Sequence, residues 1–266
     1  MAGLTGSGKT TYLAALSYLL EKPTKDQSFV MGETLEDKSY LYRLYDPWLQ
    51  FRTVDRTAQG AITSTTFDLV TSKDPSSHIK LKLPDIAGED FSSLLTGSAY
   101  VKDNLQYEPD SLLYFINGKD LAPHSLVEDL MDETNEYSST NNPSPSAFSI
   151  NSISKDVLNV LLLKELLKTF KFKRVCFIIS CFDTKEEGDI PKEILSDNAP
   201  FLYNFIQYHF PQSNICGLSA QGVEYNDGDE AQQLKLLEET RNGERAYVII
   251  EGNKYYDITL PLKNLM

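Results

Sequence analysis

The segment "GLTGSGKT" at residues 3–10 constrains the fold more than any other part of the sequence. It matches the pattern G-x-x-x-x-G-K-[ST] at every fixed position, and the residues that follow are good helix formers. Glycines allow successive backbone N–H groups to point at phosphate oxygens, and the following helix adds the positive end of its dipole. The sequence therefore predicts a phosphate-binding loop that leads into a helix, as part of an α/β fold.

The side chains of this loop have separate expected roles. Lys9 is expected to neutralise the β- and γ-phosphates of a nucleotide, and Thr10 to offer its hydroxyl to Mg²⁺. Thr11 is either a second phosphate contact or simply a residue of the first helical turn. The alternative to the whole interpretation is a glycine-rich turn before a helix. The predicted nucleotide contacts of the loop are Gly3, Gly6, Ser7, Gly8, Lys9, Thr10 and Thr11.

A second pattern, "DIAG" at residues 85–88, follows a segment in which apolar and polar residues alternate. The alternation predicts a half-buried strand with Asp85 at its tip. A carboxylate at that place can hold a Mg²⁺-bound water, and Gly88 can present its N–H to a γ-phosphate because no side chain is in the way. Without the phosphate loop, the same pattern would fit an ordinary strand that ends in a polar turn.

Two further strands are predicted to end at polar residues. Residues 174–184, "RVCFIISCFDT", form a continuous apolar run, typical of a strand buried on both faces, that ends at the polar stretch from Ser180 to Asp183. A shorter run ends at Ser219 and Ala220. A carboxylate at Asp183 can accept hydrogen bonds from N1 and the exocyclic amine of guanine, whereas adenine offers no such pair of donors. Each strand, taken singly, also fits a core strand with a polar end.

Taken in order, the four stretches resemble the P-loop GTPases of the translation-factor-related class over nearly the whole chain. "GSGKTTYLAAL" and "DIAGEDF" are similar to segments of the bacterial double-GTPase domains associated with conflict and defence systems. The resemblance implies a P-loop three-layer sandwich with a mostly parallel sheet, Mg²⁺ as the metal, and GTP or GDP as the ligand. It also implies base contacts from Ser219 and Ala220 beside Asp183, and a protein effector or a second GTPase subunit as partner.

The sequence departs from the pattern of this class at two places. Ser180 and Cys181 stand where the class usually has Asn or Thr followed by Lys, so that position lacks the aliphatic stem that covers the base. Because this stem is missing, we expect the site to discriminate guanine from adenine less strongly. Glu89 stands where many relatives carry a water-orienting glutamine, and its carboxylate either repels the γ-phosphate or acts as a base toward water. Repulsion would make hydrolysis slow.

The Thr-rich residues 55–70 are where a nucleotide-sensing loop is expected. The resemblance implies that one threonine there completes the Mg²⁺ shell, and Thr57 is chosen over Thr63, Thr65 and Thr66. The residues predicted to take part in catalysis are then Lys9, Glu89 and Thr57. Those predicted to hold the metal are Thr10, Asp85 and Thr57.

The chain is interpreted as one domain over residues 1–266 with a flexible, Ser-, Asn- and Pro-rich insertion at residues 132–152. Only Met1 and Ala2 precede the loop, so its usual first strand is expected to be missing and the loop under-supported. Residues 246–251 could supply that strand. The turn at Gly252 instead favours pairing them with residues 254–259 as a C-terminal hairpin. The last six residues look like the first turn of a helix.

Composition excludes several classes of partner. The chain has 25 Lys and Arg against 38 Asp and Glu, a formal net charge of −13, which opposes binding to nucleic acid or an anionic membrane. No apolar run approaches the roughly 20 residues of a membrane span. The 3 cysteines lie in apolar runs, which predicts reduced, buried thiols and a cytoplasmic location.

The sequence as a whole predicts a Mg²⁺-dependent GTP-binding switch with slow hydrolysis. Two alternatives stay open: a nucleotide-binding scaffold with little or no turnover, and a P-loop ATPase in which Asp183 merely ends a strand.

Overall fold

The structure is a computed structural model that describes residues 1–24, 27–32, 39–52, 54, 59–60, 62–74, 76, 78–105, 108–121, 153–225 and 229–265. The helices are α1 (Lys9–Glu21), α2 (Ser39–Leu49), α3 (Gly88–Ser93), α4 (Tyr100–Asn104), α6 (Lys155–Thr169), α7 (Pro191–Asn198), α8 (Pro200–His209), α9 (Glu230–Asn242) and α10 (Leu260–Lys263). The strands are β1 (Phe29–Met31), β2 (Ile62–Thr71), β3 (His78–Ile86), β4 (Ser111–Asn117), β5 (Arg174–Ser180), β6 (Asn214–Ser219), β7 (Tyr247–Ile250) and β8 (Asn253–Tyr255). The described residues also include the short 3₁₀ turns η1 (Leu94–Thr96), η2 (Gly118–Asp120) and η4 (Phe182–Thr184).

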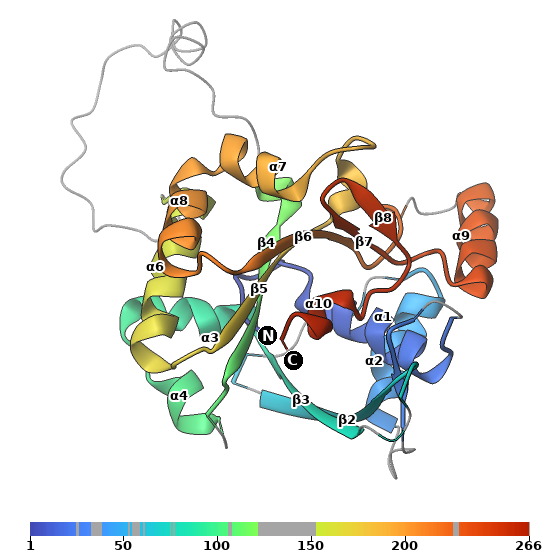
Figure 1. Ribbon diagram of the computed structural model, residues 1–266, viewed down its shortest axis with the longest axis horizontal. Helices are drawn as coiled ribbons and strands as arrows, with labels where there is room; N and C mark the ends of the chain where they lie inside the picture. The colour runs from blue at the N-terminus through green and yellow to red at the C-terminus, as the bar shows by residue number, and fades with distance from the viewer. Residues whose placement is uncertain are drawn as a thin grey trace, which may run out of the picture.

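The strands form two sheets (Figure 1). The larger has the order β4-β5-β6-β7-β8, and the smaller is antiparallel with the order β1-β2-β3. In the larger sheet β4, β5 and β6 are parallel, whereas β7 and β8 pair antiparallel. The predicted α/β class is confirmed, but the sheet is mixed rather than mostly parallel. Its last two strands are joined by a tight turn, which permits only antiparallel pairing.

Strands β4 and β5 of the larger sheet are buried on both faces, as their continuous apolar runs predict. Phe115 and Ile178 face a cluster that includes α1, α2 and α10, and Tyr114 and Phe177 face a second cluster that includes α6 and α8. Figure 1 shows these two groups of helices on opposite sides of β4, β5 and β6. Parallel strands buried in this way bring their carboxyl ends to one edge of the sheet, where loops can form a site.

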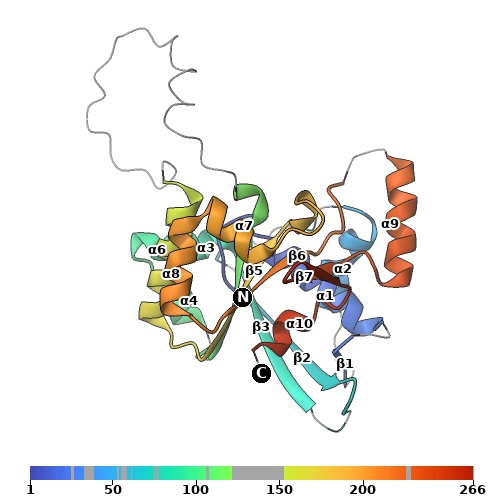
Figure 2. The same cartoon turned by 45° about the horizontal axis from the view of Figure 1, so that its top comes forward.

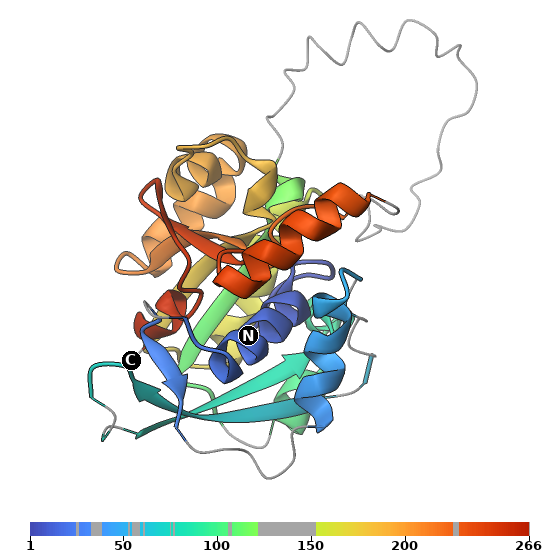
Figure 3. The same cartoon turned by 90° about the vertical axis from the view of Figure 1, so that its right-hand side faces the viewer.

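The smaller sheet carries the predicted "DIAG" segment. The long hairpin of β2 and β3 lies beside α1 and α2 (Figure 3), and Phe67 and Leu69 of β2 are buried in the same cluster as Leu13 and Trp48. An apolar cavity of about 300 Å³ lies between β3 and β4, with Met1 and Leu262 among its lining residues. This packing fixes the end of β3 next to the N-terminal loop.

The N-terminal loop is anchored on the edge of β4. Ala2 forms a single parallel bridge with Tyr114. The Ala2 N–H donates to Leu113 O at 2.9 Å, and the Phe115 N–H donates to Ala2 O at 2.8 Å. One bridged residue therefore sets the position from which residues 3–8 leave the sheet.

The predicted C-terminal hairpin is confirmed, with shorter strands than expected. Ile249 of β7 pairs with Lys254 of β8, and β7 also pairs with β6, so residues 246–251 extend the far edge of the larger sheet. Figure 2 shows α9 beyond this hairpin, on the opposite side of the molecule from α6 and α8. The predicted helical turn is confirmed as α10. The predicted insertion at residues 132–152 lies outside the described residues, and the assignment of one domain stays a prediction.

Candidate functional site

Residues 3–8 form a tight loop between the bridge at Ala2 and the start of α1. Gly3 has φ +148°, and a Cβ there would lie 2.4 Å from Phe115 O, so only glycine permits this close approach to β4. Gly8 has φ +80°, and a Cβ there would lie 3.0 Å from the Cβ of Ser180 at the end of β5. The glycines of the motif thus fit the loop against the carboxyl ends of two parallel strands.

Lys9 lies inside this loop, and its side chain is buried with 6% of its surface exposed. Its Nζ donates to Gly3 O at 2.9 Å, to Leu4 O at 3.0 Å and to Ser7 Oγ at 3.2 Å. A buried ammonium needs such acceptors, and phosphate oxygens are stronger ones because they are charged. The ammonium is therefore held where the predicted phosphates would bind.

Gly88 packs directly on the loop. A Cβ on Gly88 would lie 2.4 Å from Thr5 Cα and 2.5 Å from Thr5 N. The two motifs, about eighty residues apart in the sequence, are thus in contact as the predicted site requires. The backbone of Asp85 pairs with that of Thr63, one residue before the end of β3.

The structure places Thr10 and Glu89, two further residues that were predicted to take part in metal binding or catalysis, but does not describe Thr57. Thr10 is in the first turn of α1, and Glu89 is half-buried in the first turn of α3. Thr57 lies outside the described residues, whereas residues 62–70 of the expected switch segment form part of strand β2 and not a loop.

Asp90 is a residue of this region that the sequence patterns did not single out. It is buried, and its carboxylate accepts from the Gly60 N–H at 3.0 and 3.2 Å. The Tyr100 hydroxyl donates to Gly60 O at 2.5 Å. The residue next to the expected water-orienting position therefore fixes Gly60, which lies within the expected switch segment. No local signal distinguishes Asp90 from a solvated helix residue, because its partner is thirty positions away.

Asp183 lies in η4, directly after β5. Its Oδ1 accepts from Ser219 Oγ at 2.9 Å, and Ser219 Oγ in turn accepts from the Gly222 N–H at 3.0 Å. Ser219 is fully buried. The predicted base-reading carboxylate and the predicted serine are thus joined by a hydrogen bond that orients the carboxylate.

A cavity of about 250 Å³ extends from Gly8, at the end of the loop, to Asp183. This volume is close to the lower limit for small-molecule pockets, about 300 Å³. It brings together Gly8, Thr11, Asp183 and Ala220 from the predicted set. The remaining lining residues, which the motifs did not include as site residues, are Lys119, Ser180, Cys181, Gln221, Val223, Glu224 and Tyr225.

Cys181 corrects the expectation that all the cysteines are buried in strands. Cys176 and Cys216 are buried with their Sγ atoms 3.9 Å apart, but Cys181 is half-buried, adopts φ 52° and lines the cavity. It follows the last residue of β5 rather than lying within the strand. Burial, and then the nearby Asp183 carboxylate, raise the pKa of the Cys181 thiol, so at neutral pH it is a neutral wall of the cavity.

The loop after β6 rests on α2. Trp48 Nε1 donates to Ala220 O at 2.8 Å, and the guanidinium of Arg245 lies 3.7 Å from the centre of the Trp48 ring. Arg245 also donates to Trp48 O at 2.8 Å, to Gln221 O at 3.1 Å and to the Tyr225 hydroxyl. Burial lowers the pKa of Arg245 to about 10, which leaves it charged at neutral pH. This buried cation therefore holds one wall of the cavity.

A glycine loop with a buried lysine, placed at the carboxyl ends of parallel strands and joined by a cavity to an oriented carboxylate, defines a P-loop nucleotide-binding protein. The family model described as Double-GTPase 1 matches residues 1–265. The chain therefore belongs to the Double-GTPase 1 family and is a P-loop GTPase domain, which indicates GTP binding. A comparison with curated proteins gave no match. Within the described part of the chain, no helix has both the length and the apolar character needed to span a membrane.

Proposed function

We propose that this domain is a Mg²⁺-dependent GTP-binding switch that hydrolyses GTP slowly without a partner. The observation that carries the proposal is the cavity that runs from Gly8 and Thr11 of the phosphate loop to Asp183 and Ala220. A nucleotide laid along it has its phosphates at Lys9 and its base at Asp183. The Asp183 carboxylate then accepts from guanine N1 and the exocyclic amine, and its bond to Ser219 fixes its orientation.

The donor set at the phosphate end fits Mg²⁺, which prefers hard oxygen ligands. Thr10 supplies a hydroxyl at the start of α1, and Asp85 supplies a carboxylate near the end of β3. Thr57 is proposed as the further ligand from the switch segment. Bound there, Mg²⁺ would neutralise charge on the β- and γ-phosphates.

Gly88 is proposed to sense the γ-phosphate. Its contact with Thr5 supports this role, since a shift of the loop moves Gly88 directly. Asp90, two residues on, is hydrogen-bonded to Gly60 within the switch segment, so a movement of α3 reaches that segment. The γ-phosphate would thus hold two segments in one arrangement, and its loss would release them.

Slow hydrolysis follows from Glu89. An ionised carboxylate beside the γ-phosphate repels it and does not orient water as an amide does. The runner-up function, a nucleotide-binding scaffold with little turnover, is favoured by the same residue. The second alternative, an ATPase, is favoured by Ser180 and Cys181 in place of the usual base-reading pair.

The proposed partner is a protein effector or a second GTPase, and the description of the family as a double GTPase supports the latter. We also propose a cytoplasmic role in a bacterial conflict system. The net charge of −13 supports a protein rather than nucleic acid as partner.

Calorimetric titration of GTP, GDP and ATP, each with Mg²⁺ and with EDTA, tests the proposal. We expect GTP and GDP to bind more tightly than ATP, with weaker GTP binding in EDTA. Equal or tighter ATP binding removes the guanine assignment. Phosphate release should stay below about one turnover per second, and Glu89→Gln should accelerate it. A decrease in rate for Glu89→Gln would instead make Glu89 the base.

A further inference from the structure

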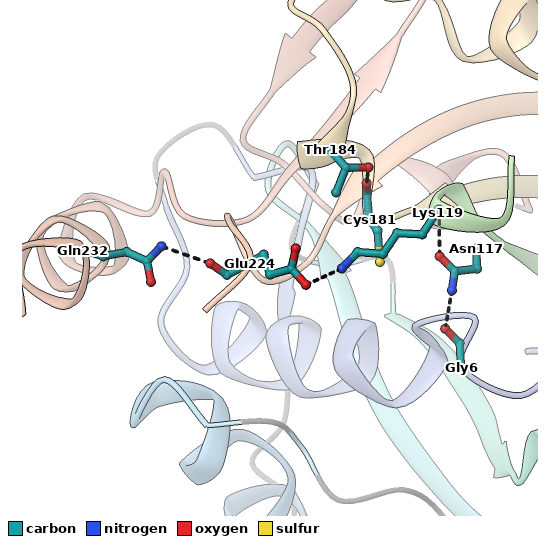
Figure 4. A network of polar contacts seen from close by, with 7 residues as sticks. All are labelled: Gly6, Asn117, Lys119, Cys181, Thr184, Glu224 and Gln232. Atoms are coloured by element: carbon teal, nitrogen blue, oxygen red, sulfur yellow. Dashed lines mark hydrogen bonds and ion pairs between the residues drawn. The ribbon is translucent and has the colours of Figure 1, made fainter. Parts of the chain in front are cut away.

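Two charged side chains outside the recognised motifs span the nucleotide cavity. Lys119 lies in η2, after β4, and Glu224 lies in the loop after β6. Their Nζ and Oε1 atoms are 2.6 Å apart, and both residues line the cavity together with Asp183. The side chains are 44% and 68% exposed, so the ion pair lies on the solvent side of the cavity. Figure 4 shows the Lys119 stem extended toward Glu224.

The backbone of Lys119 is fixed relative to the phosphate loop. Asn117 Oδ1 accepts from the Lys119 N–H at 3.0 Å, and Asn117 Nδ2 donates to Gly6 O at 3.2 Å (Figure 4). One amide side chain at the tip of β4 thus connects the loop that is expected to hold the phosphates to the turn that carries Lys119. The distance between these two parts of the site is set by the fold.

Gly118 brings the same turn against the end of β5. A Cβ on Gly118 would lie 2.4 Å from Ser180 O and 3.6 Å from Cys181 O. Lys185 Nζ also donates to Leu121 O at 3.2 Å, which ties the end of the turn to the segment after Asp183. Lys119 is therefore placed directly beside Cys181. The hydrogen bond to Glu224, and then the charges of the Glu224 and Asp183 carboxylates, raise the pKa of Lys119, so it is a cation at neutral pH.

We propose that Lys119 covers the bound base: its aliphatic stem packs on one face of the ring, and Glu224 holds it extended there. The inference rests on the proposed binding of a guanine nucleotide. An extended lysine presents apolar methylene groups and a cation to a ring face, and both interactions favour an aromatic base. An exposed ion pair contributes little to stability, so it can open to admit the nucleotide at small cost.

The test is calorimetric titration of GDP with Mg²⁺ into the wild-type chain, Lys119→Ala and Lys119→Met. Methionine keeps most of the stem and removes the charge, whereas alanine removes both. We expect GDP to bind about tenfold more weakly to Lys119→Ala and within about threefold of wild type to Lys119→Met. Lys192→Ala, an exposed lysine on α7, is the matched control and should not change binding. Glu224→Gln breaks the ion pair but keeps the stem, so it should also stay within about threefold.

Inosine diphosphate, which lacks the exocyclic amine, separates covering of the base from recognition of its edge. Lys119→Ala should weaken GDP and inosine diphosphate by the same factor. Unchanged GDP binding by Lys119→Ala, or equal losses in the alanine and methionine variants, would overturn the covering role while the proposed function stands. A folded wild-type chain that binds neither GTP nor GDP would overturn both. Thermal unfolding of the nucleotide-free variants should match wild type, and a lower melting temperature confined to Lys119→Ala would assign Lys119 a structural role.

Discussion

The proposed nucleotide site has two ends, a proposed phosphate end at Lys9 and a proposed base end at Asp183, and they are built in different ways. The phosphate end consists of one short segment, residues 3–10, in which Lys9 bonds to Gly3, Leu4 and Ser7 of its own loop. The base end is assembled from segments after β4, β5 and β6, and it rests on Arg245 from still further along the chain. The geometry of the phosphate end is set by consecutive residues, whereas the geometry of the base end depends on how several distant segments pack together. Substitutions at the two ends should therefore differ in which nucleotides they affect and in whether they also affect folding.

The largest expected effect is at the phosphate end. Lys9→Ala removes charge-assisted hydrogen bonds to the phosphates that GTP, GDP and ATP share. We expect all three to bind about 4 kcal/mol more weakly, or about a thousandfold. Calorimetry measures this, and Lys22→Ala, an exposed lysine just after α1, should leave binding unchanged. A loss under about tenfold would mean that the buried ammonium does not contact phosphate.

At the base end, Asp183→Ala should weaken GTP and GDP by about 2 to 4 kcal/mol, because a carboxylate that accepts two hydrogen bonds is lost. ATP binding should not change, unlike in the Lys9 variant. Asp197→Ala, at an exposed position on α7, provides the matched control in the same titrations. Equal weakening of GTP and ATP would show that Asp183 acts on the shape of the cavity and not on the base edge.

Arg245→Met, which replaces the arginine by an uncharged side chain of similar length, tests whether Arg245 stabilises the wall of the cavity near Asp183. The variant removes the Arg245 donors to Trp48 O and Gln221 O, of which Trp48 O keeps only the Phe51 N–H, and it removes the cation over the Trp48 ring. We expect the free energy of unfolding to fall by about 2 kcal/mol, measured by urea denaturation. Arg241→Met, at an exposed position on α9, should change it by less than about 0.5 kcal/mol. Unchanged stability of Arg245→Met would remove the argument that this wall depends on a buried cation.

The smallest expected effect on nucleotide binding is that of a substitution at Ser219. Ser219→Ala removes the hydrogen bond to Asp183 Oδ1 and leaves the Gly222 N–H without its acceptor. GTP should bind about 1 kcal/mol more weakly, about fivefold, with ATP binding unaffected. Titration of both nucleotides, with Ser196→Ala on α7 as control, checks this. A loss as large as that of Asp183→Ala would mean that Ser219 contacts the base itself.

Part of this site could be predicted because the evidence was local. The positions of Gly3, Gly8 and Lys9, and the helix that follows them, came from eight consecutive residues. The ends of β5 and β6 came from apolar runs that stop at polar residues. The C-terminal hairpin came from a turn at Gly252. Each of these depends on neighbours in the sequence, which fix backbone geometry directly.

The roles of Asp90, Lys119 and Arg245 could not be predicted in this way. Each side chain has its structural partner 20 or more positions away, as in the bond from Arg245 to Trp48 O, 197 positions apart. Their own surroundings in the sequence are those of ordinary polar residues on turns and helices. The mixed sheet was missed for a related reason, since the direction of β7 depends on how it meets β6 and not on its own residues.

The sequence by itself determined that this protein is a P-loop nucleotide-binding protein, because a phosphate-binding loop is a short motif whose glycines and lysine occur at fixed spacing. It also predicted where two carboxylates lie, Asp85 near the end of β3 and Asp183 just after β5, because the pattern of each strand reveals its end. The tertiary structure decided what surrounds them: the contact of Gly88 with Thr5, the bond from Ser219 to Asp183, and the ion pair of Lys119 with Glu224. These contacts join the ends of separate strands, and only the packing of the sheet brings those ends together.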